Sequence, residues 1–104
     1  MNKQEAQVIR KLVKQALAAG YTVSVWDGEE WALKLSTQPE KIMGELGATD
    51  CEVLRFRDKG RQVASVTLIY GNSPAEVIAD YSAADLDAFS EWLAPINAYA
   101  EGVH

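Results

Sequence analysis

The sequence contains one cysteine, Cys51, and one histidine, His104, among its 104 residues. A single cysteine excludes an internal disulfide framework and a zinc site built from several thiolates. A single histidine at the last position offers no oriented base for a serine or cysteine nucleophile. The seven glycines are dispersed, so the chain has no glycine-rich phosphate loop. We therefore predict that the protein is not an enzyme and that it uses no cofactor or metal.

Long hydrophobic runs are also missing. No apolar stretch approaches the roughly 18 residues that a membrane helix needs. The first segment carries spaced bases rather than a charged stretch followed by an apolar one, so it does not resemble a secretory leader. Together with the single cysteine, these absences predict a cytoplasmic location and no membrane partner. The length predicts one domain spanning residues 1–104.

Basic residues are absent from the last part of the chain. Residues 1–61 hold all ten Lys and Arg together with nine acids, whereas residues 62–104 hold six acids and no base. These acids form either a solvated surface or an electrostatic surface for a basic partner. A nucleic-acid mimic directed at host nucleases is an alternative that needs the acids in one line. The six are Glu76, Asp80, Asp85, Asp87, Glu91 and Glu101.

Hydrophobic periodicity predicts an α+β domain. Apolar residues at spacings of three and four predict a helix from Ala6 to Leu17. A second helix is predicted after Ser82, with Pro95 kinking or ending it, and a short one after Thr37. Alternating residues predict five strands, at 21–26, 31–36, 52–57, 62–70 and 76–81. The order α-β-β-α-β-β-β-α favours a mostly antiparallel five-stranded sheet with helices packed on one face.

Both predicted hairpins raise a question of loop length. The apolar residues of the two strands in each hairpin share a face only if the connecting loop contains an odd number of residues. Three-residue loops at 26–28 and 58–60 bring the apolar residues of each hairpin together and place a glycine last. This prediction puts Trp31 on the core face of the sheet, together with Leu33 and Leu35.

The opposite face of the predicted sheet combines apolar, hydroxyl and basic residues. Tryptophan and arginine are enriched at interface centres. Three interpretations remain: a half-exposed sheet face, a homodimer interface, and a platform for a ligand or single-stranded nucleic acid. The net charge of −5 and the pI of about 4.8 argue against nucleic acid. The candidate interaction residues are Trp26, Lys34, Arg55, Arg57 and Ile69.

A second candidate site involves four polar residues around the last turn and strand, which could converge on a small ligand at the sheet rim. They are Tyr70, Asn72, Asp80 and Tyr81. The alternative gives each a local role, as a turn-forming amide, half-buried phenols and a carboxylate near a helix start. The acidic tip at residues 27–30 has two similar interpretations, a carboxylate site or a solvated turn.

Three segments resemble parts of small uncharacterised proteins encoded on bacterial plasmids and prophages. They are GYTVSVWDGEEW (20–31), LRFRD (54–58) and LIYGNSPAEVIADYSA (68–83). No activity is assigned to such proteins, so the resemblance transfers no functional residue. It implies an accessory role in a mobile genetic element. We expect a non-enzymatic accessory or regulatory protein that binds itself as a homodimer or binds another protein. The alternatives are the nucleic-acid mimic and a small-molecule-binding domain.

Overall fold

The helices and strands follow the order expected from the sequence. The structure, a computed structural model, describes residues 1–102, so His104 lies outside the described residues. The elements are α1 (Lys3–Ala18), β1 (Thr22–Trp26), β2 (Trp31–Ser36), α2 (Pro39–Gly44), β3 (Cys51–Asp58), β4 (Arg61–Ile69), a short 3₁₀ turn η1 (Pro74–Glu76), β5 (Ile78–Ala83) and α3 (Leu86–Gly102).

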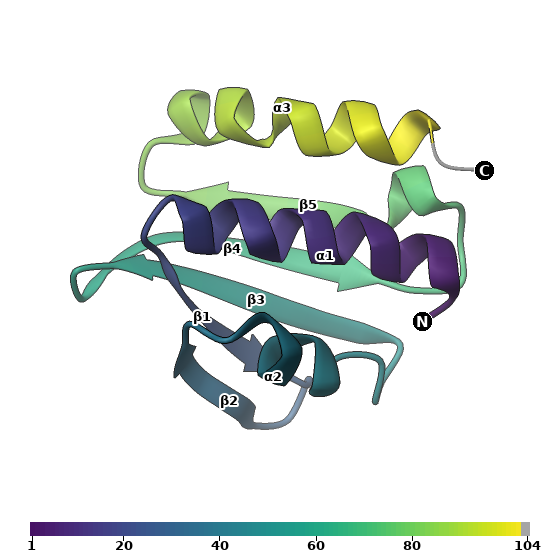
Figure 1. Cartoon of the computed structure of the whole chain (residues 1–104), viewed down its shortest axis with the longest axis horizontal. Coiled ribbons are helices and arrows are strands. Elements are labelled where there is room, and N and C mark those ends of the chain that lie inside the picture. Colours follow the sequence, from purple (N-terminus) through teal and green to yellow (C-terminus); the bar gives the residue numbers. More distant parts are fainter. Residues whose placement is uncertain (103–104) are drawn as a thin grey trace.

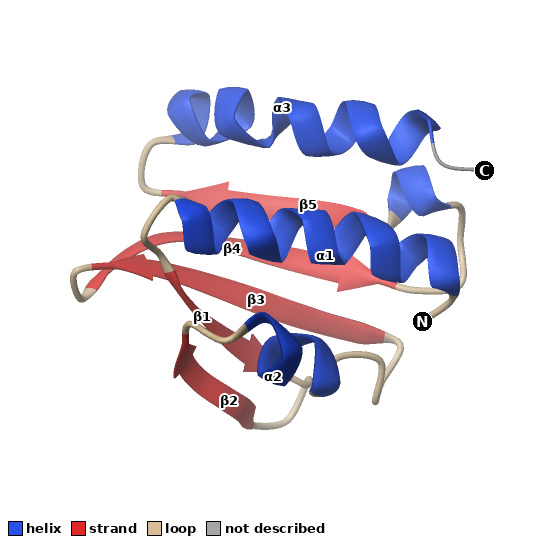
Figure 2. Cartoon of the chain, viewed as in Figure 1, coloured by secondary structure: helices blue, strands red, loops and turns tan. Residues whose placement is uncertain are grey.

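The five strands form one antiparallel sheet in the order β2-β1-β3-β4-β5. The helices lie on one face of this sheet, with α1 crossing its middle and α3 running along β5 (Figure 1, Figure 2). The predicted α+β architecture is confirmed. Alternate strand residues meet the apolar stripes of the helices in one core, because both periodicities bury one side only. The strands contribute Val23, Val25, Leu54, Phe56, Val66 and Leu68, all fully buried.

The first helix is fixed at its start by a capping box. The Asn2 side chain accepts a hydrogen bond from the Glu5 backbone N–H, and the Glu5 carboxylate accepts one from the Asn2 N–H. Glu5 is buried, and its second oxygen accepts the Gly71 N–H at 2.8 Å. This side chain therefore also fastens the loop after β4 to the start of α1.

The last helix differs from its predicted boundaries. Ser82 was expected to cap it, but Ser82 lies inside β5, and the Asp85 carboxylate accepts the Ala88 N–H instead. Pro95 lies within α3, which continues to Gly102. Proline removes only one intrahelical hydrogen bond, and the ring of Pro95 lies on an exposed position. Packing of the residues beyond it, such as Ile96, stabilises the final turns.

The β3–β4 hairpin has the predicted pairing of apolar residues, but its loop differs from the predicted one. Its loop contains two residues, Lys59 and Gly60, both with positive φ (51° and 82°), between the paired residues Asp58 and Arg61. A β-bulge then inserts Val63, so that Phe56 faces Ala64. The three-residue loop predicted at 58–60 is wrong. The shared core face is correct, because a bulge shifts the alternation by one residue as an odd loop does.

The turn at Lys59 offers a test of this hairpin. Two-residue turns with positive φ at both positions favour Asn-Gly, whereas a lysine pays a steric penalty there. We expect Lys59→Asn to raise the free energy of unfolding by about 0.5–1 kcal/mol. Urea denaturation measures the change, and Lys59→Ala, which keeps the strained backbone, provides the control. An equal gain in both variants would show that the effect does not come from the turn.

Candidate functional site

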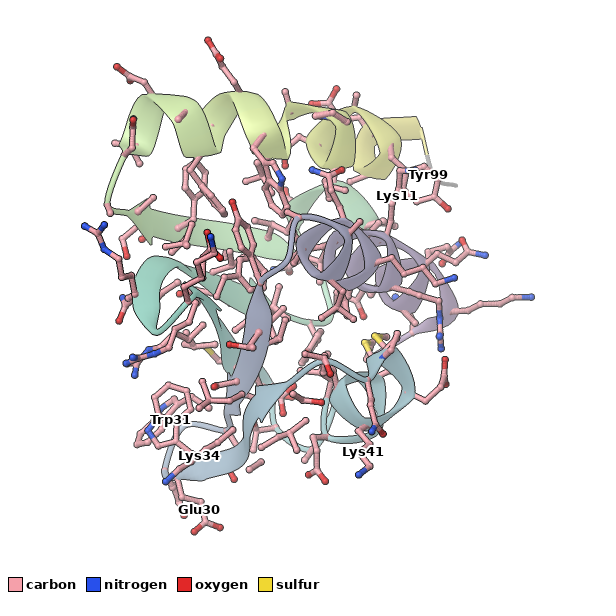
Figure 3. All side chains as sticks on the ribbon, turned by 60° about the vertical axis from the view of Figure 1, so that its left-hand side comes forward. Lys11, Glu30, Trp31, Lys34, Lys41 and Tyr99 are labelled. Carbon is pink, nitrogen blue, oxygen red and sulfur yellow. The ribbon has the colours of Figure 1, made fainter. Side chains whose placement is uncertain are left out.

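The face of the sheet opposite the helices is open in the described chain. Of the candidate interaction residues, Trp26, Arg55 and Arg57 occupy this face on β1 and β3, and Lys34 joins them from β2. Figure 3 shows Lys34 beside Trp31, on the side of the sheet away from α1 and α3. The open face has two recesses. Ile69, which is 36% exposed at the end of β4, lines neither of them.

Trp31 reaches the open face because the first hairpin has a four-residue loop. Trp26 pairs directly with Trp31, and the Asp27 carboxylate accepts the N–H groups of Glu29 and Glu30, both at 2.9 Å. These hydrogen bonds lower the pKa of Asp27. The predicted loop at 26–28 and the core-facing Trp31 are therefore wrong. An aspartate followed by glycine was the available signal, because aspartate readily closes a turn with its own side chain.

Two irregularities in β2 then shape the site. Val25 pairs with Leu33 and Val23 with Ser36, so one extra residue interrupts the alternation in each interval. Leu35 has a φ of 51°, which is unusual for a branched aliphatic residue. Its N–H donates to the buried Ser24 hydroxyl at 2.9 Å. This conformation leaves the Leu35 side chain 57% exposed, beside Lys34 at the edge of the open face.

The centre of the site is a guanidinium stacked on an indole. The Arg55 guanidinium carbon lies 4.3 Å from the centroid of the Trp31 ring, and Trp26 meets Trp31 edge to face at 5.2 Å. A recess of about 250 Å³ lies on one side, and another of about 360 Å³ lies on the other. The first is lined by Ser24, Trp31, Lys34, Leu35, Arg55 and Arg57. The second is lined by Trp26, Trp31, Val53 and Arg55.

The charged groups at this site are all cations. Among the described residues, no carboxylate lines either recess. Within residues 1–102 the one ion pair joins Arg10 to Glu40, so Lys34, Arg55 and Arg57 have no carboxylate partner. The Arg55 Nε is buried without an acceptor. We call Trp26, Trp31, Lys34, Arg55 and Arg57 the cationic patch. In a protein of net charge −5, it is a local concentration of positive charge and of hydrogen-bond donors.

The four residues of the predicted rim site do not converge. Asp80 pairs with Thr67 and Tyr81 with Val66, so their side chains point to opposite faces of the sheet. The Tyr81 hydroxyl lies 2.7 Å from the Ser90 hydroxyl. Tyr70 follows the end of β4, and Asn72 is exposed in the turn beyond it. None of the four lines the cavities described here.

Tyr70 instead belongs to a buried hydrogen-bond network. Its hydroxyl donates to the Glu52 carboxylate at 2.5 Å, and the Gly47 N–H donates to the same oxygen at 2.8 Å. Glu52 is fully buried, and its other oxygen has no partner among the described residues. Burial, followed by the bond to Glu52 and the charges of Glu52 and Glu5, raises the pKa of Tyr70. The network fixes the loop before β3 to the end of β4.

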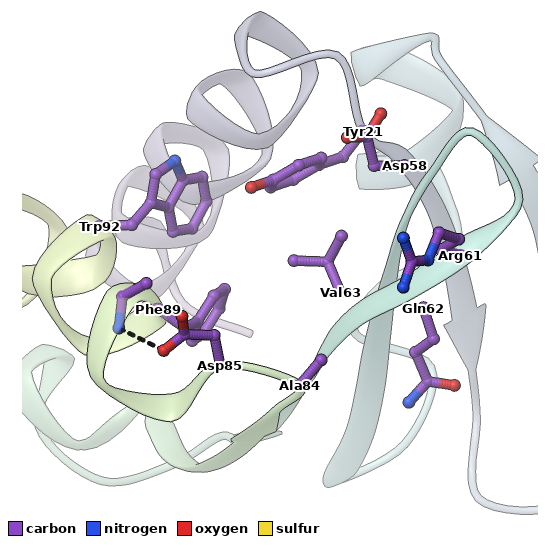
Figure 4. Close-up of a pocket in the computed structure, with 10 residues that line it drawn as sticks. Tyr21, Asp58, Arg61, Gln62, Val63, Ala84, Asp85, Phe89 and Trp92 are labelled. Atoms are coloured by element: carbon purple, nitrogen blue, oxygen red, sulfur yellow. Dashed lines mark hydrogen bonds between the residues drawn. The ribbon is translucent and has the colours of Figure 1, made fainter.

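A third cavity, of about 480 Å³, opens on the helical side of the sheet (Figure 4). Tyr21, Phe89 and Trp92 form its aromatic wall, and the β4 bulge turns Val63 into it. Its rim carries one cation and two carboxylates, namely Arg61, Asp58 and Asp85. This mixture favours no single ligand charge, so the cationic patch remains the stronger candidate site.

Comparison with known proteins identifies no relative: no family model, curated protein or solved structure matches this chain. Within residues 1–102 no helix has the length and apolar character needed to cross a membrane. The same residues hold no cluster of three or more metal-ligating His, Cys, Asp or Glu side chains.

Proposed function

We propose that the protein is a non-enzymatic accessory or regulatory protein that acts in the cytoplasm through protein–protein contact. The contact surface is the cationic patch, and its occupant is an acidic segment of another protein. The observation that carries this proposal is a set of three cations beside two tryptophans on the open sheet face, none of which has a carboxylate partner within residues 1–102. An accessory role in a mobile genetic element, implied by the sequence resemblance, agrees with this mode of action.

Aromatic and arginine side chains contribute most to binding at protein interfaces. Stacking on Trp31 fixes the Arg55 guanidinium before any partner arrives, so less side-chain entropy is lost on binding. The uncompensated positive charge speeds association with an acidic partner and disfavours a basic one. The patch therefore has aromatic anchors, a preorganised donor and a defined charge preference.

A second copy of this chain is a weaker occupant. A two-fold axis through the patch would place the cations of one copy against the same cations of the other. Like charges brought together at an interface cost several kcal/mol. The positions of the acids argue against the nucleic-acid mimic. Asp80 lies on the open face, whereas Asp87 and Glu91 lie on α3, on the helical side. The acids of residues 62–104 therefore do not form one line.

Selection from a random peptide library on the immobilised protein tests the proposal. We expect enrichment of acidic sequences, and we expect Arg55→Glu to weaken the selected peptides by at least about tenfold, or about 1.4 kcal/mol. Lys14→Glu is the matched control, because it makes the same charge change on an exposed position of α1. Acidic peptides should bind this control as they bind the wild type.

Three outcomes would overturn the proposal. The first is that peptides bind Arg55→Glu and the wild type equally. The second is a dimer in light scattering that Trp26→Glu dissociates, which would assign the face to a second copy. The third is tighter binding of a single-stranded oligonucleotide than of any selected peptide, with the same sensitivity to Arg55→Glu.

A further inference from the structure

The side chains that line the recess between Lys34 and Arg57 are rich in hydrogen-bond donors and, among the described residues, include no carboxylate. Lys34, Arg55 and Arg57 are cationic donors. The Ser24 hydroxyl also lines the recess; its oxygen accepts the Leu35 N–H at 2.9 Å, and its hydrogen is available to be donated. With the Trp31 indole N–H, five of the six lining side chains carry donors, and none of the described lining residues is a carboxylate, which fits a ligand that accepts hydrogen bonds.

The Arg55 guanidinium group lies over the Trp31 ring, with its central carbon 4.3 Å from the ring centroid. A guanidinium lying over an indole ring keeps its N–H groups in its own plane, at its edges, where an oxyanion binds in a bidentate manner. The Arg55 Nε has no acceptor within the described chain and is removed from solvent. Arg57 uses one of its nitrogens on the Gly60 carbonyl, at 3.3 Å, which leaves its other donors free. Both guanidinium groups therefore have unused donors beside the recess.

Three cations around about 250 Å³ exceed what one carboxylate can neutralise. A carboxylate carries one charge and two oxygens, whereas a phosphoryl group on a side chain carries up to two charges and three acceptor oxygens. The adjoining recess, with Trp26, Trp31 and Val53, has no charge besides Arg55 and can hold an apolar neighbour of the charged residue. Charge, donor number and the apolar neighbour together fit a phosphorylated side chain in a hydrophobic context.

We propose that this recess is a phosphoryl-binding subsite, and that the segment bound by the cationic patch is phosphorylated. This inference rests on the proposed function, since it names the chemistry of the acidic segment. Phosphorylation of the partner would then control the association. On the neighbouring strand β4, Arg55 pairs with Ser65, and β4 contains no carboxylate that could occupy the Arg55 donors in place of a ligand.

The first experiment uses inorganic phosphate as the probe. We expect titration with phosphate, at constant ionic strength, to shift the NMR signals of the Arg55 Nε–H and the Trp31 indole N–H. Arg57→Gln should reduce the affinity for phosphate at least about fivefold, and Lys14→Gln should leave it unchanged. Arg55→Lys keeps the charge but loses the planar guanidinium group, so it should also bind phosphate more weakly than the wild type. Unshifted signals, or shifts that Lys14→Gln abolishes equally, would overturn the subsite.

The second experiment compares three versions of one library-selected peptide, with phosphoserine, glutamate or serine at the charged position. We expect the phosphoserine peptide to bind at least about tenfold more tightly than the glutamate peptide. Its advantage should shrink as the pH falls below about 6, where the phosphoryl group gains a proton. Equal affinities would overturn the phosphoryl inference and leave the proposed function standing.

Failure of the library to yield any acidic sequence would overturn the proposed function as well. A single-stranded oligonucleotide that binds more tightly than the phosphoserine peptide, and that loses binding in Arg57→Gln, would assign the phosphoryl group to nucleic acid instead. Binding of free phosphate with no gain from the phosphoserine peptide would assign the subsite to a small anion. Each outcome thus names a different source of the same chemistry.

Discussion

Phe56→Ala should lower the free energy of unfolding by about 3–5 kcal/mol. Phe56 is fully buried at the centre of an aromatic cluster, with ring centroids about 6 Å from those of Tyr21, Phe89 and Trp92. Removing the ring loses its burial and leaves a cavity that β3, paired on both sides, cannot collapse to fill. Since a domain of this size has about 5–15 kcal/mol of stability, the variant should be close to unfolding.

Denaturation with urea, followed by tryptophan fluorescence, gives this change directly. Two variants provide the comparison. Phe56→Leu keeps most of the volume and should cost less than about 1.5 kcal/mol. Thr67→Ala, on the open face of the neighbouring strand, should stay within about 0.5 kcal/mol. A loss below about 1 kcal/mol for Phe56→Ala would contradict the packing of α3 on the sheet described here.

The second large effect is expected at Tyr70. Tyr70→Phe removes the hydrogen bond to Glu52 and should cost about 2 kcal/mol near neutral pH, because the acceptor is a buried carboxylate. The effect should also depend on pH. The pKa of Tyr70 is raised in the folded protein, so the folded state holds this proton more tightly than the unfolded state does.

The sign of the pH dependence follows from this difference. The contribution of Tyr70 is fully present below the pKa of an unfolded tyrosine, about 10, and is lost as the pH rises above that value. Stability of the wild type should therefore fall more steeply between about pH 9 and about pH 11 than that of Tyr70→Phe. Tyr99→Phe, which changes an exposed tyrosine of α3, should keep the wild-type slope. Equal slopes in all three proteins would contradict the bond to Glu52.

Much of the fold was predictable because it depends on local periodicity. The apolar stripe of α1, the alternation in β3 and β4, and the order of the elements all follow from which side of each element must be buried. Leu54 and Phe56, two positions apart along β3, lie on the same face of the sheet and are fully buried there. Boundaries were less predictable: β5 begins at Ile78 rather than at residue 76, because η1 occupies residues 74–76.

The candidate site was predicted only in part. Trp26, Arg55 and Arg57 were assigned to the open face because they alternate with buried neighbours along their strands. The position of Trp31 was missed because it depends on whether the hairpin loop has three or four residues. The side chain of Asp27 closes the four-residue loop, and that one residue of difference moves the indole from the core to the site.

The prediction of a rim site was wrong because residues close in the sequence do not meet in space. Asp80 and Tyr81 are adjacent in the sequence, but adjacent strand residues point to opposite faces. Tyr70 was expected beside them, yet its hydroxyl turns inward to Glu52, a carboxylate that nothing in the local pattern marks as fully buried. Proximity in sequence was therefore a poor guide to convergence in space.

The sequence by itself determined the α+β class, the side of each main element that is buried, and the lack of a base in residues 62–104. These properties depend on periodicity and composition, which are local. Only the tertiary structure decided that Trp31 lies under Arg55 and that three cations share a recess without a carboxylate. Such contacts depend on loop lengths and bulges, because a shift of one residue reverses the face of every side chain that follows.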